Sequence, residues 1–159
     1  MIRLGYLIAA AVIVLDQVTK YWIVHHVMAP PRVIEVTGFF NIVMVWNRGA
    51  SFGLFRAESD TGPLILGLIA IAICIALTIW LRRVTHRWLG CALGLVIGGA
   101  LGNVIDRVWH RAVADFLDFH AFGYHWPAFN VADIAISVGV GMLLLDGLIG
   151  GRRDHRLEA

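Results

Sequence analysis

Charged residues are scarce in this chain. Only 15% of its 159 residues are Asp, Glu, Lys or Arg, whereas an average soluble domain has about 25%. The formal net charge of +2 is too small to indicate a nucleic-acid partner. Cysteine is scarcer still. The two cysteines, Cys74 and Cys91, lie in apolar stretches and lack metal-ligand spacing, which argues against a disulfide scaffold and a cysteine-based metal site.

Apolar sequence is abundant and is gathered into long runs. Hydrophobic residues make up 59% of the chain, and a membrane-spanning helix needs about 20 of them in a row. Four runs are long enough, at about residues 4–27, 62–81, 88–108 and 129–149. Because Asp16, Gln17 and Lys20 interrupt the first run, we interpret it as a retained helix and not a cleaved signal peptide. We therefore predict an all-α membrane protein, a four-transmembrane-helix bundle in a single domain over residues 1–159.

The arginines indicate how the spans are oriented. With the N-terminus inside, the short inner segments carry seven of them: Arg3, Arg82, Arg83, Arg87, Arg152, Arg153 and Arg156. The longer outer segments carry four: Arg32, Arg48, Arg56 and Arg111. Because cytoplasmic segments are enriched in basic residues, we predict that both termini are cytoplasmic.

The first outer loop is more than a linker. Residues 32–37 and 39–46 are rich in β-branched and aromatic side chains and are separated by Gly38, which predicts two short strands. We expect an outer-face β segment at about residues 30–58, forming a small extracytoplasmic β-sheet on the membrane surface.

Polar residues inside the spans lie at a similar depth. Counted from the inner face at about 1.5 Å per residue, Asp16 and Lys20 lie about 18 and 24 Å along the first helix, and Asn103 and Arg107 about 21 and 27 Å along the third. The fourth span begins at the outer face with polar residues of its own. Charged groups in a membrane are unfavourable and usually functional, so these positions predict a site near the outer surface. The alternative is that the polar pairs only hold the bundle together. For Arg107 we favour a supporting role, in which it balances nearby acidic charge.

Two aspartates near that surface suggest an acid pair. Asp115 lies in the second outer loop and Asp133 opens the fourth helix. Two carboxyls that share one site retain a proton between them. The ionised one can then activate a water while the protonated one polarises a carbonyl, with no metal or cofactor. Spacing alone leaves open that these are ordinary solvated loop aspartates, the role that we assign to Asp118.

Five segments in order carry a resemblance to a known family. They are Asp16 to Lys20, Asn47 to Gly53, Gly98 to Arg107, Val113 to Phe116, and Phe129 to Asp133. Over nearly its whole length the sequence resembles the lipoprotein signal peptidases, also called signal peptidase II.

The resemblance implies both residues and a reaction. The family's catalytic aspartates fall on Asp115 and Asp133. Its supporting and substrate-binding residues fall on Asp16, Lys20, Asn47, Gly99, Asn103, Arg107, Phe129, Asn130 and Ala132. The implied protein is an aspartyl endopeptidase of the bacterial cytoplasmic (inner) membrane. It would remove the signal peptide from diacylglyceryl-modified prolipoproteins by cutting before the lipidated cysteine. Its partners would be that substrate and membrane lipid, with no metal, cofactor or nucleic acid, and we expect a monomer.

Three alternatives remain at the level of sequence. A serine–lysine peptidase would pair Ser51 with Lys20, although Lys20 has an acid one helical turn away. A zinc site would use the clustered side chains of His110, Asp115, Asp118, His120 and His125. A proton-coupled transporter or channel subunit would use the intramembrane charges as a relay, but the inner halves of the spans are apolar.

Overall fold

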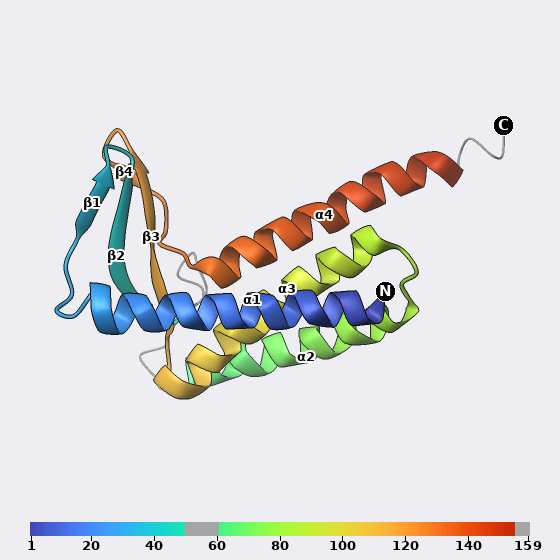
Figure 1. Cartoon of the computed structure of the whole chain (residues 1–159), viewed down its shortest axis with the longest axis horizontal. Coiled ribbons are helices and arrows are strands. Elements are labelled where there is room, and N and C mark those ends of the chain that lie inside the picture. The colour runs from blue at the N-terminus through green and yellow to red at the C-terminus, as the bar shows by residue number, and fades with distance from the viewer. Residues whose placement is uncertain (50–60, 155–159) are drawn as a thin grey trace.

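Four helices form the body of the protein. The computed structural model describes residues 1–49 and 61–154, and within them four helices are long and apolar enough to cross a membrane. They are α1 (Ile2–Trp22, continued by the π-helical turn η1, Ile23–Val27), α2 (Gly62–Arg83), α3 (Arg87–His110) and α4 (Val131–Asp154). The N-terminus and the far end of α4 lie at one end of the bundle, and a small sheet stands at the other (Figure 1). The predicted fold class is confirmed, whereas the single-domain assignment stays a prediction.

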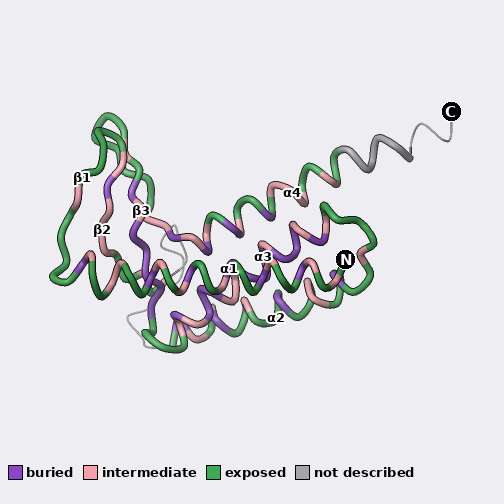
Figure 2. Tube along the Cα trace, in the orientation of Figure 1, coloured by how far each residue is buried: buried purple, intermediate pink, exposed green. Residues whose placement is uncertain are grey.

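Helix α3 is the centre of the bundle, because α1, α2 and α4 all pack against it. Buried residues are concentrated along it (Figure 2). Two adjacent glycines let two helices approach closely. A Cβ on Gly98 would lie 2.7 Å from the Ala9 carbonyl oxygen of α1, and one on Gly99 would collide with the Ala132 carbonyl oxygen of α4. Small residues at such crossings bring backbones together in membranes, and here they bring α1 and α4 to one level of α3.

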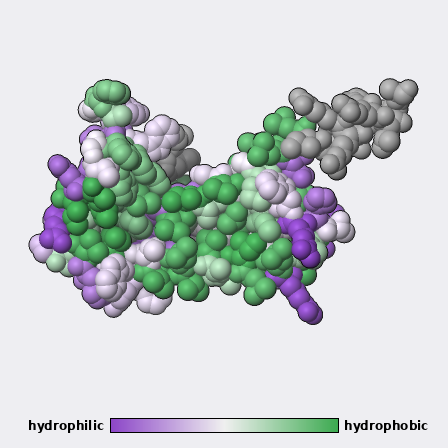
Figure 3. All heavy atoms as spheres, turned by 45° about the horizontal axis from the view of Figure 1, so that its top comes forward, coloured by the Kyte–Doolittle hydropathy of each residue, from purple (hydrophilic) through white to green (hydrophobic). Residues whose placement is uncertain are grey.

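The outer faces of the helices are apolar. Exposed side chains on them include Leu7 of α1, Ile75 of α2 and Leu144 of α4, and hydrophobic residues cover much of the helical body (Figure 3). Exposed apolar surface on this scale fits contact with lipid tails.

The sheet has more strands than the sequence predicted. In the described residues it is antiparallel, in the order β1 (Ile34–Thr37), β2 (Phe40–Asn47), β3 (Val113–Ala121) and β4 (Tyr124–His125). The first two confirm the predicted strands. The sequence placed Asp115 and Asp118 in the second outer loop without predicting a strand there, whereas the structure forms β3 in this connection and pairs Val113 to Phe119 with β2.

Local backbone geometry explains how β3 enters the sheet. Arg111 adopts a left-handed conformation (φ 56°) directly after α3, which ends the helix and turns the chain into β3. At the other end Phe122 and Gly123 both have positive φ, 53° and 79°. Positive φ at both central residues is the geometry of a tight two-residue hairpin, and it folds β4 back onto β3.

Candidate active site

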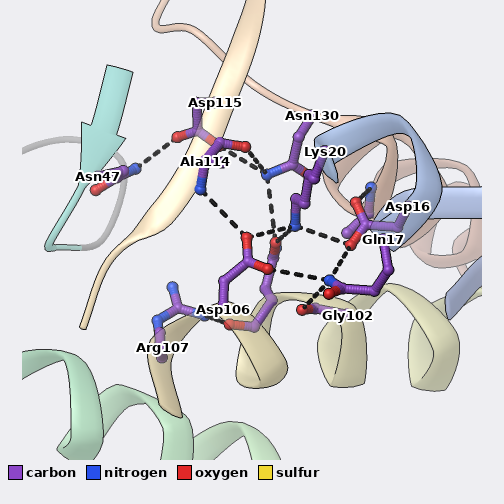
Figure 4. A network of polar contacts seen from close by, with 12 residues as sticks. Asp16, Gln17, Lys20, Asn47, Gly102, Asp106, Arg107, Ala114, Asp115 and Asn130 are labelled. Carbon is purple, nitrogen blue, oxygen red and sulfur yellow. Dashed lines mark hydrogen bonds and ion pairs between the residues drawn. The ribbon is translucent and has the colours of Figure 1, made fainter. Parts of the chain in front are cut away.

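The polar residues that the sequence predicted at one depth meet where α1, α3, β3 and α4 come together (Figure 4). The glycine crossings allow this convergence. A Cβ on Gly102 would lie only 2.6 Å from the Asp16 carboxylate, so glycine at this position leaves room for a buried acid. Asp16, Lys20, Asn103 and Asn130 are all buried.

Asp115 is almost completely buried, with 2% of its surface exposed. Asn130 Nδ2 donates to its Oδ1 at 2.7 Å, and Asn47 Nδ2 donates to its Oδ2 at 3.0 Å. Asn47 is itself oriented, because its Oδ1 accepts the Gly49 backbone N–H at 3.0 Å. Burial is the main cause that raises the pKa of Asp115 from 3.8 to about 6. The charge of Asp133 raises this pKa further, while the bonds from Asn47 and Asn130 and the charge of Lys20 oppose the rise.

Asp133 lies in the first turn of α4, where a reciprocal cap holds it. The Asp133 backbone N–H donates to Asn130 Oδ1 at 3.1 Å, and the Asn130 backbone N–H donates to Asp133 Oδ2 at 3.2 Å. This pattern is a capping box. Asn103 Nδ2 donates to the other carboxylate oxygen at 2.8 Å. Asn130 therefore donates to both carboxyl groups, to that of Asp115 through its side chain and to that of Asp133 through its backbone N–H.

Unlike Asp115, Asp133 is only half-buried. It lines an open groove of about 450 Å³ with residues that are mostly apolar: Trp126, Pro127, Ala128, Phe129, Ile134, Ser137 and Val138. Phe129 also stacks on Phe119 of β3, with ring centroids 5.8 Å apart. The groove thus offers an apolar surface that leads to one ionisable carboxyl, while the second carboxyl is buried and is linked to the first through Asn130.

The pair on α1 supports the opening of α4. Lys20 Nζ lies 2.8 Å from Asp16 Oδ2 and donates to Asn103 Oδ1 at 3.0 Å. The other oxygen of Asp16 accepts the Ala132 backbone N–H at 3.0 Å. An acid at a helix N-terminus satisfies donors that have no partner within the helix and opposes the positive end of the helix dipole. Because its amine is engaged with these acceptors, Lys20 is a poor general base for Ser51, which lies outside the described residues.

Arg107 and Ala132 complete the predicted set. The Arg107 guanidinium is half-buried and donates to the Asn103 carbonyl oxygen at 3.4 Å. The acids of Asp133, Asp115 and Asp106 lie near enough to interact with its charge, which fits the predicted balancing role. Ala132 is fully buried, where Gly99 meets α4.

Two polar residues at the site, Asp106 and Gln17, were absent from the predicted set. Asp106 is 3% exposed. Its Oδ2 lies 2.9 Å from Lys20 Nζ, and its Oδ1 accepts from Gln17 Nε2 at 3.0 Å. Both residues fall within the segments that carry the family resemblance. The spacing of Asn103 and Asp106, three residues apart on one helix, puts them on the same face and could have identified Asp106.

The solvated role assigned to Asp118 was wrong. Asp118 is 6% exposed and lies in β3. It accepts from Asn41 Nδ2 at 3.0 Å and contacts His125 Nδ1 at 2.9 Å. Pairing of β3 with β2 buries it, which a loop assignment could not anticipate.

The proposed zinc ligands are divided between two places. His125 stacks on His120, with centroids 4.9 Å apart, whereas His110 packs against Trp46 at 5.2 Å. Over residues 1–49 and 61–154, no three His, Cys, Asp or Glu side chains are grouped so that they could hold a metal ion. That the reaction needs no cofactor stays a prediction.

Known proteins resemble the chain over nearly its whole length. A family model described as signal peptidase (SPase) II matches residues 8–149. The lipoprotein signal peptidase of Rhodopseudomonas palustris (strain TIE-1) is 46% identical over 155 residues, which cover 94% of each chain. That of Methylobacterium radiotolerans is 46% identical over 161 residues, which cover 99% of this chain and 93% of the relative. A solved structure described as a bacterial membrane enzyme superposes with a TM-score of 0.79 at 36% identity, covering 91% of this chain and 87% of the other.

Proposed function

The chain belongs to the signal peptidase II family, the aspartic peptidases that remove signal peptides from prolipoproteins, and we propose that Asp115 and Asp133 perform this cleavage. The observation that carries the proposal is the position of Asn130, which bonds to both carboxyls at the end of an apolar groove. The comparisons give no support to a transporter or channel subunit. The chain is a multi-pass membrane protein.

We propose that the substrate lies in the groove with its scissile carbonyl beside Asp133. Asp133 as a carboxylate takes a proton from a water, whose oxygen attacks the carbonyl carbon. Asp115 holds the shared proton, because burial and the neighbouring charge favour its neutral form. It donates this proton to the carbonyl oxygen as the tetrahedral intermediate forms. When the intermediate collapses, the C–N bond breaks, the leaving nitrogen takes the proton that Asp133 accepted, and Asp115 regains its own.

The groove supports a lipid-modified substrate. Its lining is mostly apolar apart from Asp133 and Ser137, and burial of an acyl chain contributes about 0.8 kcal/mol per CH₂. We propose that the cut precedes a diacylglyceryl-modified cysteine, that membrane lipid borders the groove, and that the enzyme acts as a monomer.

The test is a cleavage assay on matched substrates. Purified protein should release the signal peptide from a diacylglyceryl-modified prolipoprotein, as sized by mass spectrometry, and leave the unmodified form intact. A strong chelator should not change the rate, because two carboxyls and a water suffice. Equal cleavage of both forms would contradict the lipid requirement. Loss of activity on chelation, restored by zinc, would contradict the metal-free mechanism.

We also propose that both termini are cytoplasmic and that the site lies near the outer face. The arginine distribution supports this orientation, as does the position of the N-terminus and of the far end of α4, which both lie at the end of the bundle away from the sheet (Figure 1). A reporter fused after Arg83 should therefore give a cytoplasmic signal, and one inserted at Gly123 an external signal. The opposite pair of signals would contradict the proposed orientation.

The rate should depend on pH through Asp115. Its pKa lies above the ordinary value, at about 6, so the proton is retained between pH 4 and pH 6, where an exposed aspartate has lost it. If Asp115 is the proton donor, kcat/KM should fall as pH rises through about 6. Asn47→Leu removes a donor that stabilises the ionised form, so this limb should move to higher pH. A profile that is flat between pH 5 and pH 8 would show that Asp115 does not donate.

A further inference from the structure

Asp106 is not among the residues that line the groove, and no hydrogen bond of the described residues joins it to the carboxyl of Asp115 or Asp133. It is nevertheless connected to both aspartates through other residues. Its Oδ2 accepts the Ala114 backbone N–H at 3.2 Å. Ala114 directly precedes Asp115 and is itself 2% exposed. The same oxygen lies 2.9 Å from Lys20 Nζ, and Lys20 donates to the side chain of Asn103, which donates to Asp133.

The backbone of Ala114 is held by side chains from two helices. Asp106 of α3 accepts from its N–H, and Asn130, which precedes α4, donates to its carbonyl oxygen at 3.3 Å. Both contacts lie within one residue of Asp115, at the beginning of β3 and shortly after the left-handed turn at Arg111. A small displacement of this backbone would therefore move the Asp115 carboxyl relative to Asp133.

We propose that Asp106 is a positioning residue for the cleavage reaction, and that its Oδ2 sets the place of Asp115 by holding the Ala114 N–H. This inference rests on the proposed function of Asp115. The position of the oxygen matters more than the charge, because Asp16 already supplies a carboxylate to Lys20 and a hydrogen bond to a backbone N–H needs only an acceptor.

Two conservative variants separate position from charge. Asp106→Asn removes the charge but keeps an oxygen where Oδ2 lies, so Ala114 and Lys20 keep their acceptor and only the Gln17 contact is disturbed. We expect kcat within about fivefold of wild type, the equivalent of one net hydrogen bond. Asp106→Glu keeps the charge but extends the side chain by one methylene and displaces that oxygen. We expect kcat to fall by at least about tenfold, since a 1 Å misplacement can reduce rate by about a hundredfold. KM should stay unchanged in both, because neither alters the groove.

The measurement is kcat and KM on the diacylglyceryl-modified substrate, with thermal unfolding of each variant in detergent. Leu93→Ala is the control for general destabilisation, because Leu93 is a fully buried core residue of α3. It should lower Tm and leave kcat unchanged at temperatures where it is folded. If Asp106→Glu does not fold, Asp106→Ser takes its place. Serine shortens the side chain without crowding, and we expect the same loss in kcat.

The kcat of Asp106→Asn relative to that of Asp106→Glu tests the proposal. If Asp106→Glu matches wild type while Asp106→Asn is impaired, Asp106 acts by charge and the positioning role is overturned. It is also overturned if both variants keep wild-type kcat, or if Asp106→Glu loses activity only in proportion to its Tm. Failure of the proposed function would give a different result. The wild-type protein would then leave the substrate uncut, or the Asp115→Asn variant would cut it as fast as wild type.

Discussion

Replacement of either Asp115 or Asp133 by asparagine should lower turnover by about 10²- to 10⁴-fold, the range that a positioned acid or base supplies. The substitution keeps the shape of the side chain but removes the ionisable group, and it places an amide N–H₂ where one of two accepting oxygens lay. Asp133→Asn leaves the water without a base, and Asp115→Asn leaves the carbonyl without a proton donor. The double variant should be little slower than either single one, because groups that act as a unit are not additive.

Asp118→Asn is the matched control for this pair. Asp118 lies three residues after Asp115 in the same strand and is similarly buried, but its partners are Asn41 and His125. The Asp118→Asn variant should lose part of the contact with His125 and keep its turnover close to that of wild type. Single-turnover cleavage of a lipidated substrate measures all four proteins, with insertion checked by membrane extraction. Cleavage near the wild-type rate by a correctly inserted Asp115→Asn or Asp133→Asn variant would contradict the two-carboxyl mechanism.

Asn130→Ala should have the second largest effect, because it acts on both carboxyls. It removes the donor to Asp115 Oδ1 and the acceptor for the Asp133 backbone N–H. Loss of the cap should reduce stability by about 1 kcal/mol. Turnover should fall by about a hundredfold or more, since misplacement of catalytic groups by about 1 Å has effects of this size.

Asn130→Ser separates the two roles. Serine is also a good N-cap, but its hydroxyl is too short to replace the Nδ2 donor that Asp115 uses. We expect Asn130→Ser to unfold near the wild-type temperature and yet to be nearly as slow as Asn130→Ala. If Asn130→Ser recovers both stability and rate, the residue matters only as a cap, and the bridge between the carboxyls has no role in catalysis.

Much of the fold follows from local sequence. The four spans are visible as apolar runs because a bilayer requires about 20 such residues whatever the rest of the chain does. The shared depth of Asp16, Lys20 and Asn103 follows from the helical rise alone. Gly98 and Gly99 are small residues that permit close helix approach in membranes, and the contacts of α3 with α1 and α4 use them in this way.

The sheet was only half predictable. Strands β1 and β2 are joined by a short turn, and β-branched and aromatic residues mark both. Strand β3 is far from β2 in sequence, and it carries Asp115 and Asp118, residues that local preference assigns to loops. Only pairing with β2 makes this segment a strand, and the same pairing converts Asp118 from a solvated residue into a buried one.

By itself, the sequence determined a four-span membrane protein with acids gathered near one surface, because hydropathy and helical geometry act over short distances. It also supplied the motifs that identify the family. Only the tertiary structure decided that Asp115 is buried while Asp133 opens to a groove, and that Asp106 holds the backbone beside Asp115. The environment of a carboxyl depends on groups from other helices and strands, and burial and hydrogen bonds of this kind arise only when those elements pack together.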